Sequence, residues 1–276
     1  MSQYPQFGFG AGLRAPHYEL FLSERPKAVE WLEILSDNYL HAHPGYLEML
    51  AELRQDYPMA MHGVSLSIGS TDPLNEEYVR ALRRLAQHVQ AGWVSDHLCY
   101  TGVGGEQTHD LLPIPYTEEA LAHVIPRIHK AQDILGQKLV FENASSYMEF
   151  SGNTLSEPEF LRALHEATGC GILLDVNNVF VSCFNHGWNA KAYIDAIPAQ
   201  AVAQYHLSGH TDMGTHRIDT HDAPVIDEVW QLFSYTLSRI GPRSTLLEWD
   251  AQIPPFETLA AEVGKARQLA ARAEAA

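Results

Sequence analysis

Residues 139–176 read LVFENASSYMEFSGNTLSEPEFLRALHEATGCGILLDV and show the pattern that decides the fold. A short apolar run, Leu139 to Asn143, comes first; a segment of helical periodicity, Glu157 to Ala167, follows; a second apolar run, Gly171 to Val176, ends the stretch. Gly169 stands where the helix is expected to end, because glycine readily adopts the left-handed conformation of a helix cap. Two strands joined by a helix pair in parallel through a right-handed crossover. The stretch therefore predicts a β-α-β unit.

The same alternation continues on both sides of this unit and predicts eight strands and eight helices. The strands are expected at Phe7–Leu13, Trp31–Leu35, Met59–Val64, Trp93–Leu98, Leu139–Asn143, Gly171–Val176, Val202–Leu207 and Thr245–Trp249. The helices are expected at Pro16–Leu22, Pro44–Arg54, Asn75–Gln90, Thr117–Leu135, Glu157–Ala167, Ala190–Ile197, Val225–Ile240 and Pro255–Ala273.

Eight such units predict an α/β fold, a (β/α)₈ TIM barrel that forms a single domain over residues 1–276. The competing architecture is an open, doubly wound sheet. That sheet usually carries a glycine-rich phosphate turn after its first strand, but GFGAGLR (residues 8–14) lies within the first predicted strand rather than at a helix start. The barrel is therefore favoured.

The bulk composition excludes several classes of partner. The formal net charge is −16 with only 18 Lys and Arg residues, which opposes binding to nucleic acid or to an anionic membrane. No stretch approaches the roughly 18 consecutive apolar residues that a membrane helix needs. Three widely spaced cysteines are too few for a disulfide framework and are expected to be reduced. These features predict a cytoplasmic protein.

Residues that bind metals recur where the predicted strands end, which is where barrels of this type carry their reactive groups. The third to eighth strands end at or near His62, His97, Glu142, Asp175, His206 and Glu248. The histidine-rich segment 205–222, YHLSGHTDMGTHRIDTHD, follows the seventh strand. A lone histidine or carboxylate at a strand end is more often a core or capping residue, but six coincident endings favour a shared site.

The candidate metal ligands are His62, His97, Glu142, Asp175, Asn178, His206, Asp219, His221 and Glu248. Nine ligands suffice for two or three metal ions, and imidazole with carboxylate favours iron, manganese or zinc over copper(I). Several carboxylates buried together would repel one another at a cost of several kcal/mol per ion, which bound cations would remove. Glu142 could bridge two ions, and Glu142 and Asp250 are the candidate catalytic carboxylates.

The motifs MHGVSLSIG, SDHL, FEN, LLDVNN, YHLSGH, DTHD and LEWD, in this order, resemble the multinuclear non-haem iron-dependent oxidase family, once catalogued as a domain of unknown function. The resemblance implies a xylose-isomerase-like barrel that holds two or three iron ions in a mixed-valent Fe(II)/Fe(III) state, with dioxygen as co-substrate. It also implies that the enzyme modifies cysteine residues of a ribosomally made precursor peptide and works with a partner protein that recognises this peptide.

Carried onto this chain, the family's ligands match His62, His97, Glu142, His206, Asp219, His221 and Glu248. Asp175 and Asn178 match a further part of the pattern, with either one as the direct ligand. His210, Asp212 and His216 have no assigned counterpart and are expected to support the ligands or the local structure, since metal-bound histidines usually need an outer hydrogen-bond partner. The segment HTDMGTHRI (residues 210–218) is expected to shape the substrate entrance.

Two alternatives stay open from the residues alone. The first is a manganese- or zinc-dependent sugar isomerase or endonuclease, because barrels host many chemistries. However, the lysines fall at no predicted strand end where an isomerase base is expected, and the negative charge disfavours the basic groove of an endonuclease. The second is a non-catalytic metal-storage protein, which would not require ligands on six strands.

Overall fold

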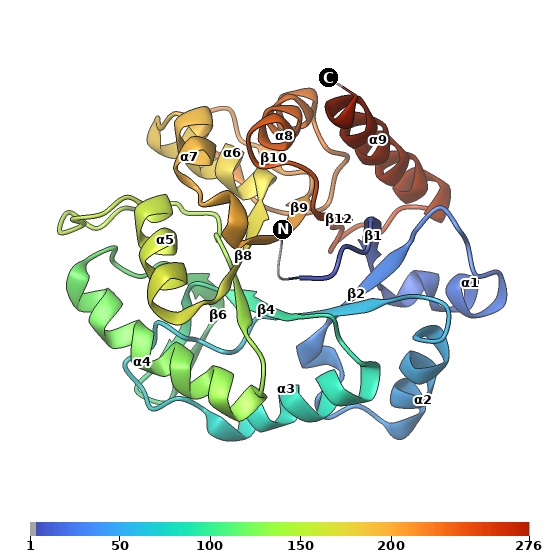
Figure 1. Cartoon of the computed structure of the whole chain (residues 1–276), viewed down its shortest axis with the longest axis horizontal. Coiled ribbons are helices and arrows are strands. Elements are labelled where there is room, and N and C mark those ends of the chain that lie inside the picture. Colours follow the sequence, from blue (N-terminus) through green and yellow to red (C-terminus); the bar gives the residue numbers. More distant parts are fainter. Residues whose placement is uncertain (1–3, 276) are drawn as a thin grey trace.

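Eight parallel strands form a closed barrel with an outer ring of helices (Figure 1). The protein is represented by a computed structural model that describes residues 4–275; residues 1–3 and 276 of the predicted domain lie outside the described residues. In barrel order the strands are β1 (Phe9–Gly12), β12 (Ser244–Leu247), β9 (Val202–Leu207), β8 (Gly171–Asp175), β7 (Leu139–Glu142), β4 (Val94–His97), β3 (Met59–Gly63) and β2 (Trp31–Leu35). The predicted TIM barrel is confirmed, and the closure of the sheet excludes the open doubly wound alternative.

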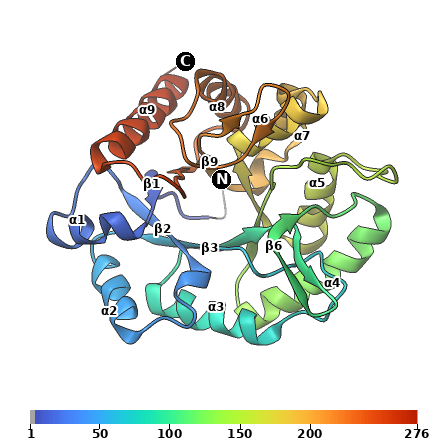
Figure 2. The ribbon, with the colours of Figure 1, turned by 180° about the vertical axis from the view of Figure 1, so that it is seen from behind.

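The helices cover the outside of the barrel, as the views from both sides show (Figures 1 and 2). They are α1 (Tyr18–Ser23), α2 (Pro44–Leu53), α3 (Glu76–Val89), α4 (Glu118–Leu135), α5 (Glu157–Thr168), α6 (Val176–His186), α7 (Ala190–Ala196), α8 (Asp227–Ile240) and α9 (Phe256–Glu274), with short 3₁₀ turns η1 (Ala15–His17), η2 (Ser36–Asn38) and η3 (Ala199–Ala201). Their ends follow local chemistry. The Thr117 hydroxyl accepts from the Ala120 amide at the start of α4, and Gly136 ends this helix with a φ of 81°.

Several local elements differ from the sequence prediction. Helix α6 occupies a segment where no helix was expected, so nine helices rather than the predicted eight lie in the described residues. The sixth strand stops at Asp175, and Val176 begins α6, because the Asp175 carboxylate caps this helix by accepting from the Asn178 amide. Two hairpins also occur in segments where no strand was expected. The first pairs β5 (Tyr100–Val103) with β6 (Glu106–Leu112), which is seen beside α4 in Figure 2, and the second pairs β10 (Thr211–Asp212) with β11 (Arg217–Ile218).

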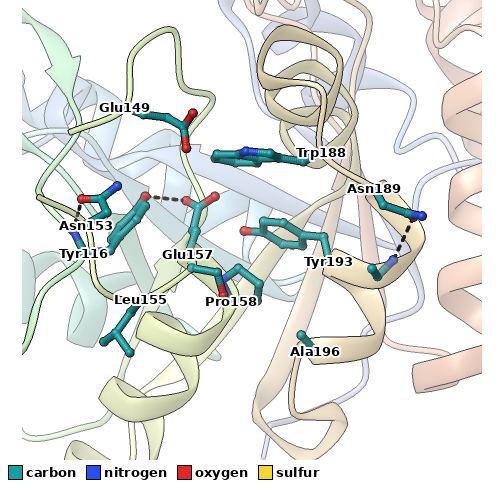
Figure 3. Close-up of a pocket in the computed structure, with 12 residues that line it drawn as sticks. Tyr116, Glu149, Asn153, Leu155, Glu157, Pro158, Trp188, Asn189, Tyr193 and Ala196 are labelled. Atoms are coloured by element: carbon teal, nitrogen blue, oxygen red, sulfur yellow. Dashed lines mark hydrogen bonds between the residues drawn. The ribbon is translucent and has the colours of Figure 1, made fainter. Parts of the chain in front are cut away.

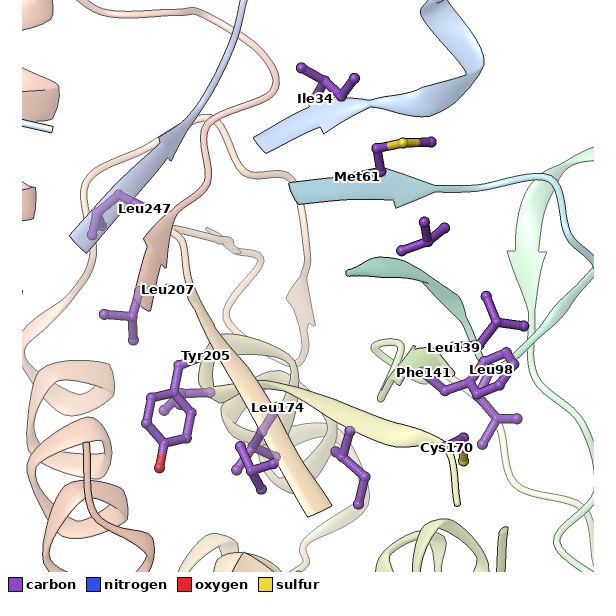
Figure 4. Close-up of a cluster of buried hydrophobic side chains, with 14 of the residues drawn as sticks. Ile34, Met61, Leu98, Leu139, Phe141, Cys170, Leu174, Tyr205, Leu207 and Leu247 are labelled. Atoms are coloured by element: carbon purple, nitrogen blue, oxygen red, sulfur yellow. The ribbon is translucent and has the colours of Figure 1, made fainter. Parts of the chain in front are cut away.

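The barrel interior is layered, because alternate residues of a strand point to opposite faces. One hydrophobic cluster lies between strands and helices and includes Ile34, Met61, Phe141 and Leu174 (Figure 4). A second, separate cluster fills the inside of the barrel with Trp31, Ala60, Trp93, Val140, Leu173, Ala203 and Leu246. The strand residues that follow this inner cluster on the same face are polar. The fold therefore places one apolar layer beneath one polar layer inside the barrel.

The polar layer follows by counting two residues from the inner cluster. On six strands, the side chain two positions after an inner-cluster residue belongs to the polar layer. The pairs are Trp31 and Glu33, Ala60 and His62, Trp93 and Ser95, Val140 and Glu142, Leu173 and Asp175, and Leu246 and Glu248. On β9 the count is three, from Ala203 to His206, because the pairing of β8 with β9 shifts register after Ile172. This irregularity turns His206 toward the same layer as the others.

Candidate metal centre

Eight acidic and histidine side chains form three overlapping groups whose ligand atoms lie within 4.8 Å of one another. The groups are His62, His97 and Glu142; Glu142, Asp175, His206 and Glu248; and His221, Glu248 and Asp250. Glu142 and Glu248 each belong to two groups, so their carboxylates connect the three. Seven of the nine predicted ligands therefore meet in one place, as does Asp250, the second predicted catalytic carboxylate.

The two histidines of the first group are oriented by their outer hydrogen bonds. His97 donates from Nδ1 to the carbonyl of Gly63 at 3.1 Å. The Nδ1 of His62 lies 2.8 Å from the Ser95 hydroxyl, which itself donates to the carbonyl of Met61, so His62 must be the donor. Each ring then carries its free lone pair on Nε2.

Both lone pairs face the same carboxylate oxygen. The Nε2 atoms of His62 and His97 lie 3.2 Å and 3.4 Å from Oε2 of Glu142. Burial lowers the pKa of both histidines, so protonation does not relieve the contact. Two lone pairs opposite a carboxylate oxygen repel one another unless a cation lies between them. This donor set fits a metal ion.

His206 lies between two carboxylates at the centre of the second group. Its Nε2 is 2.9 Å from Glu33 Oε1, and its Nδ1 is 2.9 Å from Glu248 Oε2. Burial opposes the charged imidazolium, but Glu33 and Glu248 outweigh it and raise the pKa of His206 well above its usual value. Glu33 also accepts from Gln204 at 2.7 Å, and Gln204 accepts from the Trp93 indole. Glu33, itself held by Gln204, therefore fixes the orientation of the His206 ring.

Asp175 and Asn178 both point into the second group. One Asp175 oxygen caps α6, while Oδ2 is buried without a hydrogen bond. The Asn178 amide nitrogen donates to Glu142 Oε1 at 3.2 Å and to the Asn143 carbonyl, which leaves its own Oδ1 buried and unpaired. Burial raises the pKa of Asp175 to about 7. Either side chain thus offers one free oxygen to an ion, and in the described structure neither oxygen has another partner.

The third group lies nearer the surface. His221 Nε2 is 2.6 Å from Asp219 Oδ1, and its Nδ1 is 3.4 Å from Glu248 and 3.2 Å from Asp250. Asp250 is the most accessible member, with 44% of its side chain exposed, and it pairs with the Arg14 guanidinium. His221 adopts a positive φ of 47°, and its backbone carbonyl accepts from the Asp250 amide. This strained conformation brings the histidine-rich segment against the end of β12.

Three residues have no assigned counterpart in the family: His210, Asp212 and His216. Their contacts differ. His210 is buried, and its Nδ1 lies 2.7 Å from Oδ1 of Asn177, whose amide nitrogen donates to Asp219 at 2.8 Å. His210 therefore supports Asp219 through Asn177. Asp212 pairs with Arg217 on the exposed β10–β11 hairpin, and the exposed His216 contacts its neighbour Thr215. These two residues belong to the hairpin.

The cluster combines burial with side-chain atoms that lack hydrogen bonds, and both features fit the binding of cations. Among the described residues, Glu142 Oε2, Asp175 Oδ2 and Asn178 Oδ1 are buried without a hydrogen bond. His206 Nδ1 and His221 Nε2 also lack a hydrogen bond of regular geometry, although each lies close to a carboxylate oxygen. Native proteins rarely leave so many buried polar atoms unpaired at one place.

Burial raises the pKa of Glu142, whereas His206 and His221 overcome burial and hold the pKa of Glu248 well below its usual range. The site therefore places a carboxyl group with a raised pKa, Glu142, close to one with a lowered pKa, Glu248.

Sequence reasoning missed Glu33, Arg14, Ser95 and Gln204. Glu33 had a signal, because a charged residue in the middle of the apolar run WLEIL points to a barrel interior with a polar partner. Arg14 directly follows the first strand and reaches both Glu248 and Asp250. Ser95 and Gln204 carry no such signal, since their roles depend on which strand lies next to theirs.

Comparison with known proteins identifies the family. The model of the family described as "RiPP precursor modification enzyme MbnB/TglH/ChrH" matches residues 8–271. A UPF0276 protein of Anaeromyxobacter sp. is 46% identical over 269 residues, which cover 98% of this chain and 95% of that protein. A UPF0276 protein of Caulobacter vibrioides is 47% identical over 268 residues, with 97% and 95% covered.

Solved structures share the fold at low sequence identity. L-ribulose 3-epimerase has a TM-score of 0.61 at 16% identity and covers 98% of this chain and 95% of its own. Endonuclease IV from Thermus thermophilus has a TM-score of 0.60 at 18% identity, covering 99% and 100%. These similarities confirm the xylose-isomerase-like barrel, and the family match covers nearly the whole chain. The chain therefore belongs to the RiPP precursor modification enzyme family MbnB/TglH/ChrH.

Proposed function

We propose that this protein is a multinuclear non-haem iron-dependent oxidase that uses dioxygen to modify cysteine residues of a ribosomally synthesised precursor peptide. The observation that carries the proposal is the pair of neutral, buried histidines whose free Nε2 atoms face one oxygen of Glu142. Two or three iron ions would be held by the nine predicted ligands: His62, His97, Glu142, Asp175, Asn178, His206, Asp219, His221 and Glu248. Their nitrogen and oxygen donors suit iron.

Bound iron in a mixed-valent Fe(II)/Fe(III) state would supply the redox chemistry with dioxygen and lower the pKa of a substrate thiol. The protein's own residues prepare this site. Glu142 belongs to two groups of ligands, so its carboxylate would contribute to holding more than one ion. Asp250 is exposed beside His221 and Arg14, where it can accept the proton of an incoming thiol. Glu142 and Asp250 are accordingly the proposed catalytic carboxylates.

Surface features support a peptide substrate. Tyr147, Met148, Phe184 and Met213 are large apolar side chains that are each more than 40% exposed. They lie on the segments that follow β7, β8 and β9, the same strand ends that carry the ligands. Exposed apolar side chains on the segments next to the ligands offer contacts to another chain. The proposal includes a partner protein that recognises the precursor peptide, as the motif resemblance implies.

The proposed setting is the cytoplasm. In the described residues no helix is long and apolar enough to cross a membrane. Cys99, Cys170 and Cys183 are buried and free. Free cysteines suit a reducing compartment.

The direct test combines metal content with turnover. Protein purified anaerobically should contain two or three iron ions per chain by mass spectrometry of the metals. With its Cys-containing peptide and partner, the iron-loaded enzyme should consume dioxygen and change the mass of the peptide. A peptide in which serine replaces cysteine serves as the control and should stay unchanged. An iron-loaded enzyme that neither consumes dioxygen nor changes the peptide's mass contradicts the proposal.

Two variants separate metal binding from chemistry. Glu142→Gln should lower the metal content by at least one ion per chain, whereas Glu157→Gln, a change at a buried glutamate outside the three groups, should retain all ions. Asp250→Asn should keep the two inner ions yet lower kcat by about 10²- to 10⁴-fold, the usual contribution of a positioned acid or base. Unchanged turnover in Asp250→Asn removes Asp250 from the mechanism.

The sugar isomerase or endonuclease alternative has only the fold in its favour. L-ribulose 3-epimerase and endonuclease IV share the barrel with this chain at 16% and 18% identity. An assay with manganese or zinc in place of iron and with L-ribulose or DNA as substrate tests it. Activity in that assay without activity on the peptide would favour the alternative.

A further inference from the structure

A cavity lies at the rim of the barrel, outside the three ligand groups. Its volume is about 310 Å³, and its walls come from the start of α5, from α7 and from the segment between β7 and α5 (Figure 3). Sites for small ligands usually measure about 300–1,000 Å³. This cavity is at the lower end of that range and therefore suits a single side chain.

A buried carboxyl group faces this cavity. Glu157 is 3% exposed, and Tyr116 donates to its Oε1 at 2.9 Å. In Figure 3 the Glu157 carboxyl lies between the Tyr116 and Tyr193 rings. The Tyr193 residue is only 5% exposed, and its hydroxyl makes no hydrogen bond of regular geometry. The cavity thus contains a polar side chain whose hydrogen-bonding capacity is not fully used.

Aromatic rings and a second acid complete the walls. Tyr116, Tyr193 and Trp188 present three rings to the cavity, and the remaining apolar surface comes from Leu155, Pro158, Ala192 and Ala196. Glu149 stands beside Trp188 in Figure 3, with half of its side chain exposed. The Trp188 indole stacks on His186 at a centroid distance of 4.6 Å, which fixes the orientation of the ring.

We propose that this cavity binds the cationic side chain, arginine above all, of the peptide substrate while its cysteine occupies the metal centre. The inference rests on the proposed function, because the occupant is a peptide. A planar guanidinium can pair with a carboxylate through two parallel hydrogen bonds and stack on an aromatic ring. Glu157 supplies the carboxylate, and Trp188 and the two tyrosines supply the rings.

The charge of the walls selects a cation. Among the described lining residues there is no lysine or arginine, while Glu149 and Glu157 are both acidic. An anion would meet two carboxylates without a countercharge. A neutral apolar group would give the Glu157 carboxylate no countercharge and would leave the Tyr193 hydroxyl buried without a new partner, which costs about 1–3 kcal/mol for an unpaired group.

Shared segments connect the cavity with the metal centre. The segment after β7 carries Tyr147, whose hydroxyl accepts from the Asp219 amide at 3.0 Å, and then Glu149 in the cavity wall. Helix α6 carries Asn178, beside Glu142, in its first turn and ends with His186, which lies 3.7 Å from Glu149. These two segments join the cavity wall to the ligand groups, so a peptide bound at both places would lie along them.

The test measures binding directly on metal-loaded protein, with peptides that contain no cysteine. The probes are capped Gly-Arg-Gly and the capped analogue with citrulline, a neutral isostere of arginine. Titrations followed by NMR should show binding of the arginine peptide about 10- to 100-fold tighter than of the citrulline peptide, as expected for one charge-assisted pair. Glu157→Gln should remove this preference. Glu166→Gln, the same change at an exposed position of α5, should retain it.

Each further outcome decides the inference. Trp188→Leu should weaken the arginine peptide but leave the weak binding of the citrulline peptide unchanged. Equal affinity for the two peptides, or an unchanged preference in Glu157→Gln, overturns the inference. Agmatine bound as tightly as the arginine peptide would assign the cavity to a free small cation and also overturn it. Because no probe reacts, a failure here leaves the oxidase proposal intact, and a lack of oxygen consumption leaves this binding result intact.

Discussion

Glu33 shows how a single residue outside the ligand set controls the centre. Its Oε1 lies 2.9 Å from Nε2 of His206, and its Oε2 is held by Gln204. A carboxylate behind a metal-bound imidazole fixes the tautomer and raises the basicity of the nitrogen that faces the ion. In this arrangement His206 faces Glu33 with Nε2 and faces Glu248 and Glu142 with Nδ1.

Glu33→Gln should therefore weaken metal binding without removing a ligand. The expected loss is about 10- to 100-fold in affinity, the usual effect of removing such an outer partner. Metal titration under anaerobic conditions measures it, and Glu30→Gln, at an exposed position just before the same strand, is the control. Equal affinities in Glu33→Gln and the unchanged protein would mean that Glu33 has only a structural role.

Glu157 makes stability depend on pH in a predictable direction. Burial raises its pKa from 4.5 to about 7. Because the folded state then binds more protons than the unfolded state between these values, this group's contribution to stability is lost as pH rises through that window. The groups that face it are Tyr116, Tyr193 and Cys183, with Glu149 at the rim.

Glu157→Gln does not titrate, so the difference in Tm between this variant and the unchanged protein should grow in the variant's favour from pH 5 to pH 8. This rise in the pKa of Glu157 corresponds to about 3 kcal/mol, or a Tm change of roughly 6–12 °C. Thermal unfolding at four pH values measures the difference, and Glu166→Gln should give a flat one. A flat difference for Glu157→Gln would show that its carboxyl group titrates normally in the folded protein.

Strands and helices place the ligands by simple counting. On six strands the residue of the polar layer lies two positions after a residue of the inner apolar cluster. Because side chains alternate along a strand, both point to the same face. On β9 the register shift adds one residue, and without it Tyr205 rather than His206 would point inward. The shift therefore decides whether the second group has its histidine.

Helix α6 couples the centre to secondary structure, because Asp175 both caps this helix and belongs to the second ligand group. Without cations, repulsion among buried carboxylates should loosen the first turn of α6. Metal loading should therefore slow amide exchange over residues 176–179 by about tenfold, or roughly 1.4 kcal/mol of local opening. Hydrogen-exchange mass spectrometry measures this. Helix α9, which carries none of the ligands, serves as the reference. Equal slowing of amide exchange in both helices would indicate a global effect instead.

Across the whole molecule, the barrel collects four buried carboxylates, Glu33, Glu142, Asp175 and Glu248, in one polar layer. Burying ionised groups costs several kcal/mol each unless opposite charges compensate for it. His206, His221 and Arg14 provide part of that compensation. Bound metal ions would provide the rest.

Removal of metal should consequently lower Tm. Each site that is saturated at 100 times its Kd adds about 2.7 kcal/mol to the free energy of unfolding, which corresponds to roughly 5–10 °C for a protein of this size. Calorimetry of the iron-loaded protein before and after chelation measures the loss, and readdition of iron should restore Tm. An unchanged Tm after complete removal of the ions would show that they contribute nothing to stability.

Much of this organisation could be predicted from the sequence, because it depends on local periodicity. The apolar runs between helical segments predicted all eight barrel strands, and the strand ends predicted most of the residues in the ligand groups. Trp31–Leu35 and Val202–Leu207 match the structure at both ends. The family resemblance predicted from the seven motifs is confirmed by the family match over residues 8–271.

What only the tertiary structure decided are relations between strands that lie far apart in the sequence. The pairing of Glu33 with His206 spans the barrel interior, and the pairing of Arg14 with Asp250 joins the two ends of the chain. The start of α6 at Val176 and the cavity around Glu157 likewise depend on packing between segments. Periodicity tells which face of a strand is buried, but closure of the barrel determines which buried side chains meet.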